Sequence, residues 1–352
     1  MQPYHDSYLH ACAHLGFLVS GFLQRLGLTQ KIRQDFLGAI AQSTAQNVWF
    51  TDHSIRLSLE AIAADMLAPE RLQEWLLRYD LPAGKAPKSV GIVMAGNIPL
   101  VGFHDLLCVL AVGHRAVVKL SSKDAALLPV LAKYLCQIDY RFASRVAFAS
   151  ELGGVDAVIA SGGNNTERYF ALRYGQLPHL FRRSRTGVAV LTGGESDEEL
   201  LALAHDALDY FGLGCRSVGK VFLPQGYDTA RLQRSFALLS ALRSHAPYSS
   251  CCRYAQALLQ MRRQPYFDFG SCVATPSSEL HPPVGALFLQ AYAAPSELQS
   301  LLLGCRGELQ CIATAAPIEG LAGCCVPLGA TQRPGLRDYP DGVDTIQFLR
   351  SL

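Results

Sequence analysis

The residue that best combines chemical reactivity with a suitable position is Cys215, in the segment GLGCR at 212–216. It follows a predicted helix over residues 200–211 and precedes a predicted strand over residues 220–223. Glycines just beyond a helix allow a tight turn with an accessible side chain. A thiolate there can attack a carbonyl carbon and hold the acyl group as a thioester. A buried loop cysteine near a helix C-terminus is the alternative, and the local sequence leaves both open.

Asn97 follows, after Gly96, a nearly continuous apolar run at residues 89–95, which predicts a strand buried on both faces. Ligands of open parallel sheets bind at the carboxyl ends of strands. An asparagine amide at such a place can donate a hydrogen bond to a developing oxyanion. Asparagine is also a common turn former, so the residue by itself favours a plain turn.

Lys119 and Ser121 stand at the end of a second predicted strand, at residues 116–120. An ammonium and hydroxyl groups suit the ribose or phosphate of a nucleotide. The alternative is a charged start of the next predicted helix, over residues 123–134, with Ser122 or Asp124 as its N-cap.

Gly162 and Gly163 follow a predicted strand at residues 157–160 and precede a predicted helix. A glycine loop at a helix N-terminus can cradle a phosphate. The dinucleotide fingerprint G-x-G-x-x-G is absent, and a plain turn is the alternative.

Two other groups of side chains invite a functional interpretation. His10 and His14 are one helical turn apart, but no HExxH glutamate accompanies them, so we predict a surface face and no metal site. The basic run at residues 182–185 is either a solvated face or an anion contact for a coenzyme A phosphate.

Length and composition narrow the class of protein. At about 150 residues per domain, 352 residues suggest two domains, and 50% hydrophobic with 17% charged residues excludes global disorder. The net charge of +2 gives no support to nucleic-acid binding. No apolar run reaches the roughly 18 residues of a membrane span, and no basic region precedes an apolar stretch at the N-terminus. The 11 cysteines include no CxxC pair, so we expect thiols in a reducing compartment, the cytoplasm.

The order of predicted elements indicates an α/β fold. Residues 8–79 have helical periodicity, and the Pro/Gly-rich segment at 82–87 predicts the first boundary. Strands and helices then alternate, which predicts parallel sheets with crossover helices. Further strands are expected at residues 146–149, 188–191, 284–289 and 312–315, and further helices at 100–112 and 229–243.

Taken in order, several of these segments resemble the aldehyde dehydrogenase superfamily, and most closely the bacterial acyl-CoA reductases of the LuxC type, the fatty-acid reductases of bioluminescence. The resemblance covers about residues 88–348. Its segments are GNIP (96–99), VGFHDLL (101–107), VKLSSKD (118–124), SGGNNT (161–166), VAVLTG (188–193), YFGLGCR (210–216) and RPGLRDY with DGVD (333–344).

The resemblance implies a role for each candidate residue. Cys215 matches the nucleophile that takes the acyl group, and Asn97 matches the asparagine of the oxyanion hole. A site for a nicotinamide cofactor is implied at Lys119, Ser121, Ser122, Gly162 and Gly163.

One position bears on the choice of cofactor. In the superfamily an acidic residue after the Lys-x-Ser stretch binds the ribose hydroxyls and repels a 2′-phosphate. Here that position is Ser122, and Lys123 follows. A hydroxyl removes the repulsion and an ammonium attracts the phosphate, so we expect NADPH to be preferred over NADH.

One departure from the superfamily bears on the reaction. Hydrolytic members have a general-base glutamate before Leu-Gly-Gly, and the matching stretch here, LTGG at 191–194, puts Leu191 in that place. Without a base, attack by water is poorly assisted and exchange with coenzyme A is favoured. The alternatives are a hydrolytic aldehyde dehydrogenase and a non-catalytic subunit of a reductase complex.

We therefore expect an aldehyde-dehydrogenase-like α/β protein with two parallel-sheet domains and a helical N-terminal region. The expected parts are a helical region (1–81), a cofactor domain (86–187), a catalytic domain (188–325) and a C-terminal segment (326–352) that returns to the cofactor domain or forms a subunit contact. The expected activity is the NAD(P)H-dependent reduction of an acyl-CoA, fatty by resemblance, to its aldehyde. A homo-oligomer, a dimer or tetramer, and a protein that delivers acyl groups are the expected partners.

Overall fold

The computed structural model describes residues 3–81 and 86–352 and divides into two compact units. Unit 1 contains Met1–Ser184 and Pro334–Leu352, and unit 2 contains Arg185–Arg333. The hinge predicted at 82–87 lies mostly outside the described residues. The helical N-terminal region and the C-terminal tail thus fold together with the first sheet, while the second sheet has a unit of its own.

Unit 1 begins with helices, as the periodicity predicts. They are α1 (Pro3–Gln24), α2 (Gln30–Gln46), α3 (Asp52–Ala61) and α4 (Pro69–Leu76), with the π-helical turn η1 (Ile62–Met66) between the last two. Thr51 is the N-cap of α3 and shares a capping box with Ser54. Pro69 occupies the start of α4, where its missing N–H costs nothing.

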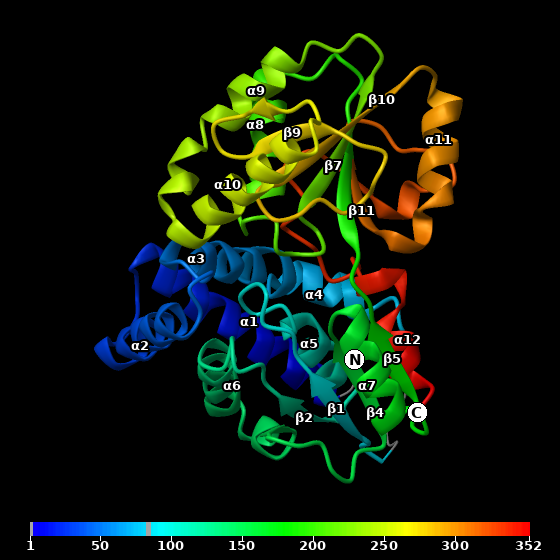
Figure 1. Ribbon diagram of the computed structural model, residues 1–352. Helices are drawn as coiled ribbons and strands as arrows, with labels where there is room; N and C mark the ends of the chain where they lie inside the picture. Colours follow the sequence, from blue (N-terminus) through cyan, green and yellow to red (C-terminus); the bar gives the residue numbers. More distant parts are fainter. Residues whose placement is uncertain (1–2, 82–85) are drawn as a thin grey trace. The chain divides into compact units, whose positions relative to one another are not determined.

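A five-stranded parallel sheet follows in unit 1. Its strands are β1 (Ser89–Val93), β2 (Arg115–Lys119), β3 (Val146–Phe148), β4 (Ala157–Ser161) and β5 (His179–Arg182), and its helices are α5 (Phe103–Ala111), α6 (Leu127–Ile138), α7 (Asn164–Tyr174) and α12 (Thr345–Arg350). The strand order is β3-β2-β1-β4-β5 (Figure 1). The chain therefore reverses its direction across the sheet between β1 and β4, and such a reversal is where open α/β sheets bind ligands.

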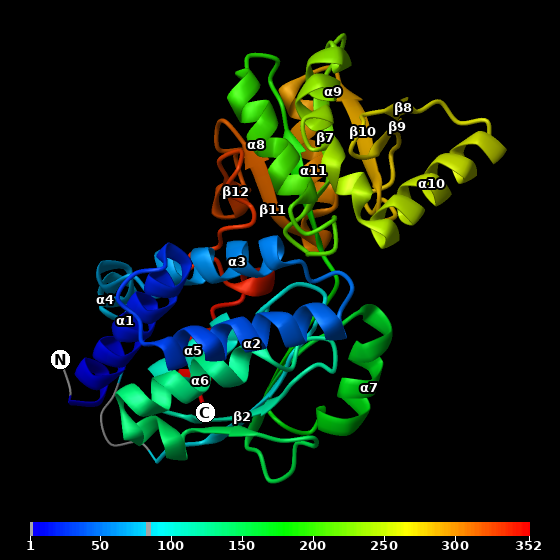
Figure 2. The same ribbon diagram turned by 90° about the vertical axis from the view of Figure 1, so that its left-hand side faces the viewer.

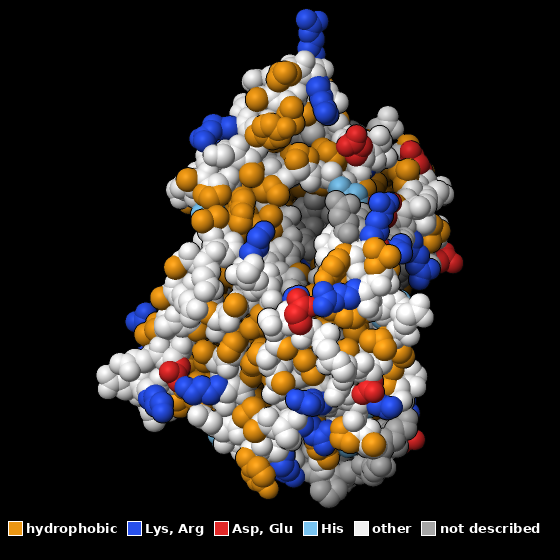
Figure 3. Space-filling model, turned by 60° about the horizontal axis from the view of Figure 1, so that its bottom comes forward, with side chains coloured by type: hydrophobic (Ala, Val, Ile, Leu, Met, Phe, Trp, Pro, Cys, Tyr) orange, Lys and Arg blue, Asp and Glu red, His pale blue; other side chains and the backbone are white. Residues whose placement is uncertain are grey.

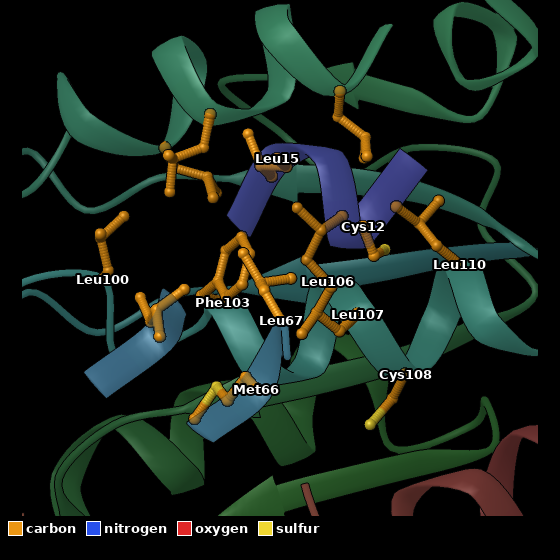
Figure 4. Close-up of a cluster of buried hydrophobic side chains, with 14 of the residues drawn as sticks. Cys12, Leu15, Met66, Leu67, Leu100, Phe103, Leu106, Leu107, Cys108 and Leu110 are labelled. Atoms are coloured by element: carbon orange, nitrogen blue, oxygen red, sulfur yellow. The ribbon is translucent and has the colours of Figure 1, made fainter. Parts of the chain in front are cut away.

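Each face of this sheet has its own core. Val90 and Ile92 of β1 point to a large apolar cluster shared with α1, α3, α5 and α6, in which Leu15, Leu67 and Phe103 lie close together (Figure 4). Val158 and Ala160 of β4 point to the other face and pack with Phe170 and Tyr174 of α7. Because successive side chains of a strand point to opposite faces, the strands supply apolar side chains to both cores, as expected for a sheet covered by helices on both sides.

Two elements of unit 1 differ from the sequence prediction. Helix α6 begins at Leu127 rather than at residue 123, because residues 121–124 form a turn in which the Asp124 N–H donates to the Ser121 carbonyl over 3.0 Å. Strand β5 was not expected, because its arginine-rich end suggested a solvated or anion-binding segment. Arg182 is instead buried, which corrects both interpretations for that residue.

Arg182 and Asp105 form a buried ion pair between β5 and α5. The Arg182 Nη2 to Asp105 Oδ1 distance is 2.6 Å, and the side chains are 6% and 5% exposed. Arg182 also donates to the Pro340 carbonyl and the Thr345 hydroxyl, which lie in the C-terminal tail. Helix α12 packs against α5 in the same unit (Figure 1). One ion pair therefore joins the sheet, its crossover helix and the tail.

Unit 2 is built on a seven-stranded sheet of order β12-β11-β6-β7-β10-β9-β8. Its strands are β6 (Thr186–Val190), β7 (Val218–Pro224), β8 (Phe267–Asp268), β9 (Val273–Pro276), β10 (Ala286–Tyr292), β11 (Leu309–Thr314) and β12 (Cys325–Val326), and its helices are α8 (Asp197–Leu208), α9 (Thr229–Ala237), α10 (Ala246–Met261) and α11 (Pro295–Gly304). All neighbouring strands are parallel except β8 and β9. Helix α8 packs against β7 (Figure 2) and starts at a capping box formed by Ser196 and Glu199.

Short 3-10 helices complete the two units: η2 (Tyr140–Ser144), η3 (Ser240–Ser244), η4 (Arg306–Glu308), η5 (Ala322–Cys324) and η6 (Pro340–Gly342). The helix predicted over residues 229–243 is thus α9 followed by η3. Within residues 3–81 and 86–352, no helix combines the length with the apolar content that crossing a bilayer requires. One face of the molecule shows charges of both signs scattered among apolar groups, in keeping with the near-zero net charge (Figure 3).

Asp105→Ala should strongly destabilise unit 1, because it leaves the Arg182 guanidinium buried without its counter-charge. We expect a loss of about 3–5 kcal/mol in the free energy of unfolding. The two tryptophans of the chain, Trp49 and Trp75, both lie in unit 1, so their fluorescence in a urea titration reports on this unit.

Arg78→Ala is the matched control, because Arg78 pairs with Glu74 on the surface, where the side chains are 53% and 64% exposed. Loss of such a pair costs under about 1 kcal/mol. Equal losses in the two variants would contradict the structural importance of the buried pair.

Candidate active site

Cys215 lies on a tight turn between α8 and β7 in unit 2. Beyond α8 the chain reverses through Phe211 and Gly212, whose φ angles of 56° and 74° are both left-handed. The Ser217 N–H then donates to the Gly214 carbonyl over 3.0 Å, and Cys215 is the second residue of this turn. Its side chain is half-buried. The thiol is therefore held at the amino end of β7, between a helix and a strand, as the sequence indicates.

Gly187 of β6 lets the neighbouring strand pass directly beside this turn. Its N–H donates to the Ser217 carbonyl over 3.1 Å. A Cβ at this position would lie 2.6 Å from the carbonyl oxygen of Arg216, which is a backbone atom and cannot move aside alone. Only glycine allows so close an approach, so the position of the turn depends on residue 187.

Asp206 of α8 holds the turn from the other side through the segment at residues 329–332. Its carboxyl group, 1% exposed, accepts hydrogen bonds from the Gly329 N–H (2.6 Å), the Thr331 N–H (2.9 Å) and the Thr331 hydroxyl (2.7 Å). The Thr331 carbonyl accepts in turn from Arg216 Nε over 2.5 Å. Gln332 adds a second link, donating to the Asp206 carbonyl and the Ser217 hydroxyl. Through Thr331 and Gln332, Asp206 is thus connected to Arg216 and Ser217, the two residues that follow Cys215.

The environment of Asp206 also limits what it can do chemically. Burial raises the pKa of its carboxyl to about 6, although the three donors lower it. Both oxygens are engaged, so this carboxyl group is unavailable to activate a water molecule. Cys311 lies next to the turn, with its Sγ donating to the Arg216 carbonyl over 3.7 Å, and burial raises its pKa to about 12. Cys311 is therefore a thiol at neutral pH and a poor nucleophile.

The structure corrects the assignment of Leu191 to the place of a general base. Strands β6 and β7 are parallel and adjacent, with Gly187 opposite Val218, and the Leu191 N–H donates to the Phe222 carbonyl. Leu191 thus lies at the carboxyl ends of the two strands, whereas Cys215 precedes their amino ends. Four residues of strand separate the two levels, about 13 Å. A residue at position 191 cannot assist attack on a thioester at Cys215, so its identity says nothing about hydrolysis.

Asn97 lies in unit 1, on the loop at residues 96–100 that follows β1, and its side chain is exposed. Three side chains from other elements hold this loop. Asn47 donates to the Gly96 carbonyl (3.3 Å), Ser58 donates to the Pro99 carbonyl (2.8 Å), and Asp124 accepts from the Leu100 N–H (2.7 Å). Asn47 directly follows α2 and Ser58 lies in α3, so the N-terminal helical region positions the Asn97 loop.

Lys119, Ser121, Ser122 and Lys123 lie at the end of β2, next to β1 in the same sheet. Lys119 is the last residue of the strand, and its Nζ is 3.4 Å from Glu151 Oε1. Ser122 and Lys123 are exposed at the tip of the turn at residues 121–124. The expectation of Ser122 or Asp124 as a helix N-cap is wrong, because α6 starts later without a side-chain cap.

Gly162 and Gly163 lie between β4 and α7. Gly163 is the N-cap residue of α7, and its carbonyl accepts from the N–H groups of Thr166 and Glu167. Since β4 pairs directly with β1, this helix N-terminus and the Asn97 loop both leave the sheet at the same edge, at neighbouring strands. The candidate cofactor residues of β1, β2 and β4 thus share one edge of the sheet of unit 1.

The remaining candidates supply no reactive centre. The rings of His10 and His14 are neighbours along α1, with centroids 5.6 Å apart and their planes inclined by 59°. Within the described residues, no group of three His, Cys, Asp or Glu side chains is arranged to hold a metal ion. The 11 cysteines, including the adjacent pairs 251–252 and 324–325, are all thiols rather than disulfides. Arg183 contacts Glu167 at the surface.

Sequence analysis missed the residues that hold the candidate site in place. They are Asn47, Ser58, Asp124, Gly187 and Asp206. Three were absent from the candidate list because a polar residue in a predicted helix looks solvated. The sequence offers Asp124 as one of two helix N-caps, and Gly187 immediately precedes the strand predicted at residues 188–191 without any sign of its role. Only their long-range contacts distinguish them.

Comparison with known proteins identifies the class of fold. Neither a protein-family model nor a curated protein matches this sequence. Solved structures of aldehyde dehydrogenases do match, and at their low sequence identities the likeness shows the fold alone. Aldehyde dehydrogenase 21 from Physcomitrella patens, solved with its product succinate, has a TM-score of 0.65 at 10% identity, over 99% of this chain and 87% of its own.

Two further structures give the same result. A NAD-dependent benzaldehyde dehydrogenase from Corynebacterium glutamicum has a TM-score of 0.59 at 12% identity, over 89% of this chain and 77% of its own. A NAD-dependent aldehyde dehydrogenase from Sinorhizobium meliloti has a TM-score of 0.63 at 10% identity, over 89% and 70%. The protein therefore has an aldehyde-dehydrogenase-like α/β fold with two parallel-sheet units and a helical N-terminal region, which confirms the predicted fold class.

Gly187→Ala should displace the turn that carries Cys215, because the new methyl group overlaps the Arg216 carbonyl. We expect a loss of about 1–3 kcal/mol in stability from overpacking. We also expect iodoacetamide to alkylate Cys215 several times faster, as followed by peptide mass spectrometry. Gly304→Ala is the control, since a Cβ there meets open space. Indistinguishable behaviour of the two variants would refute the role of Gly187.

Proposed function

We propose that the protein is a thioester-forming acyl-CoA reductase that converts an acyl-CoA to the aldehyde with NAD(P)H, and that it can run in reverse as a CoA-acylating aldehyde dehydrogenase. The observation that carries this proposal is the half-buried Cys215 thiol, held on a tight turn by Gly187 and the Asp206 network. The aldehyde-dehydrogenase-like fold supports oxidoreductase chemistry on an aldehyde or its thioester. Neighbouring structures are named NAD-dependent aldehyde dehydrogenases, which supports a nicotinamide cofactor.

The first step is acyl transfer to the enzyme. The Cys215 thiolate attacks the carbonyl carbon of the acyl-CoA, a new C–S bond forms, and the carbon–sulfur bond to coenzyme A breaks. Coenzyme A leaves as a thiolate, so the charge is conserved. Asn97 is proposed to donate its amide N–H to the oxyanion of the tetrahedral intermediate.

The residues of unit 1 fit a nicotinamide cofactor. The N-terminus of α7 offers N–H groups after Gly162 and Gly163, which suits a pyrophosphate. Lys119 and Ser121, at the end of β2, suit the adenosine ribose. When bound, the reduced cofactor supplies the hydride that converts the thioester to the aldehyde. The role of the chain is to hold the thioester and to stabilise the developing oxyanion.

The more specific part of the proposal is that the acyl group on Cys215 exchanges with coenzyme A rather than being hydrolysed by water. Its support is the LuxC-type order of motifs, together with the engaged state of the Asp206 carboxyl, which cannot act as a base for water. A hydrolytic aldehyde dehydrogenase is the second candidate, favoured by the names of the structural neighbours. Incubation of an aldehyde with NADP⁺, with and without coenzyme A, separates the two. Acyl-CoA formation supports the proposal, and a free acid formed equally without coenzyme A contradicts it.

The cellular compartment, the partners and the roles of the two units are also proposals. Eleven thiols favour a reducing compartment, the cytoplasm, where the nucleophile stays reduced. By resemblance we propose a homo-oligomer, a dimer or tetramer, and an acyl-delivering partner protein. The cofactor domain is proposed to correspond to the sheet of unit 1 and the catalytic domain to unit 2.

Cys215→Ala should lower turnover by about 10⁴-fold or more, because the covalent step loses its nucleophile. Mass spectrometry of the wild type mixed with acyl-CoA, without reductant, should locate the acyl group on Cys215. Cys251→Ala is the control, as another half-buried thiol of unit 2 outside the turn, and should retain full activity. An adduct confined to Cys251 or Cys252 would overturn the assignment.

The cofactor preference should favour NADPH by about five- to a hundredfold in kcat/KM, the effect of one hydrogen-bonded charge contact. The reason is the exposed pair of Ser122 and Lys123, which offers a hydroxyl and an ammonium to a 2′-phosphate. Ser122→Glu should shift the ratio of kcat/KM values toward NADH, by repelling that phosphate.

Ser144→Glu is the control for the added charge, because Ser144 is exposed in η2, at the opposite end of the sheet. It should leave the ratio unchanged. A wild type that prefers NADH, with no shift in Ser122→Glu, would show that neither residue contacts the phosphate.

A further inference from the structure

The loop at residues 96–100 that presents Asn97 ends in a strained residue. Leu100 has a φ of 59°, a left-handed conformation that costs a side-chain-bearing residue about 1–2 kcal/mol. Its side chain is buried and belongs to the apolar cluster of unit 1 that contains Phe103 (Figure 4). Both the backbone and the side chain of Leu100 must therefore be held in place by neighbours, or the loop would relax.

Asp124 supplies one of these restraints at an unusual cost. The Leu100 N–H donates to Asp124 Oδ2 over 2.7 Å, a short hydrogen bond to a residue that is 7% exposed. The second oxygen, Oδ1, is buried without a hydrogen-bond partner among the described residues. Burial raises the pKa of this carboxyl to about 6. Burying a carboxyl group that has only one hydrogen-bond donor costs free energy of folding. A native protein keeps such a group where it serves function or holds a strained segment.

The other two restraints on the loop act differently. Asn47 and Ser58 each donate to a loop carbonyl, at Gly96 and Pro99. Asp124 is the side chain that holds an N–H of the loop, at the strained residue itself. Asp124 also belongs to the turn at residues 121–124, through its own N–H to the Ser121 carbonyl. One residue thus connects the Asn97 loop with the turn that carries Ser122 and Lys123.

We propose that Asp124 is a positioning residue for the oxyanion donor: its hydrogen bond to the Leu100 N–H holds the loop in the conformation that presents the Asn97 amide. This inference rests on the proposed function, because it assigns Asn97 to the transition state of acyl transfer. Asp124 itself is too buried to contact a substrate. Its loss should therefore weaken stabilisation of the transition state while leaving the binding of substrate and cofactor intact.

The test compares two substitutions with different hydrogen-bonding capacity. Asp124→Ala removes the acceptor and should lower kcat by about tenfold to a hundredfold, approaching the loss for removal of an oxyanion donor. The KM values for acyl-CoA and NADPH should stay within about twofold. Asp124→Asn keeps an oxygen for the Leu100 N–H and should retain kcat within about threefold. Asp139→Asn, a change at a partly buried carboxylate that contacts Arg141 and Ser7 in the same unit, should leave kcat unchanged.

A double-mutant cycle with Asn97→Ala separates positioning from general destabilisation. If Asp124 acts through Asn97, the double variant should turn over at the rate of Asn97→Ala alone, because there is no amide left to position. Multiplicative losses would overturn the proposal, and so would a fall in kcat of Asp124→Asn equal to that of Asp124→Ala. If Asp124→Ala does not fold, the cycle is run with Asp124→Ser, whose side chain is too short to reach Leu100.

Hydrogen exchange provides a readout that does not require activity. In the variant without the acceptor, the peptide that contains Leu100 should exchange at least several times faster, while the peptides of β1 and α6 keep their protection. Unchanged exchange at Leu100 would overturn the role of Asp124 whatever the enzyme does. A wild type that releases no coenzyme A from acyl-CoA would instead refute the proposed function, with the exchange result still valid.

Discussion

Parallel pairing of β1 with β4 is the constraint on which the candidate cofactor site depends. The chain builds β1, β2 and β3 outward in one direction and then returns to place β4 on the free side of β1. Because all five strands are parallel, the segments that follow β1, β2 and β4 leave the sheet at one edge. The Asn97 loop, the turn at residues 121–124 and the N-terminus of α7 come together for this reason alone. No motif in any one of these segments encodes that proximity.

In both units, buried carboxyl groups hold the backbone beside the candidate reactive residues. Asp206 binds the segment that supports the Cys215 turn, and Asp124 binds the loop of Asn97. Among residues 3–81 and 86–352, neither carboxyl has an arginine or lysine as a hydrogen-bond partner, and burial raises the pKa of both. Asp105, by contrast, is buried with Arg182 as its counter-charge. The difference is consistent with two tasks: the ion pair joins secondary-structure elements, whereas the uncharged donors fix the path of short loops.

The position of Leu191 shows how a motif can mislead. The stretch LTGG at 191–194 resembles the part of the superfamily motif that contains the general-base glutamate. A comparison of sequences alone therefore places Leu191 where that base would stand. In the folded chain this stretch leaves the carboxyl end of β6, while the Cys215 turn precedes the amino end of β7. Two residues on adjacent parallel strands are close only when they stand at the same level. The question of hydrolysis against thiol exchange therefore rests on the residues around the turn and on experiment.

The sequence by itself determined the α/β class, most of the strands and the helical N-terminal region, because these follow from local periodicity. It also singled out Cys215 and Asn97, as reactive residue types beside predicted element ends. Tertiary structure alone decided that Arg182 is buried, that α6 starts at Leu127, and that Asp124 and Asp206 hold loops. The physical reason is range. The contact from Asp206 to Gly329 joins residues 123 positions apart, and only the packing of strands and helices between them brings a carboxyl group and an N–H within hydrogen-bonding distance.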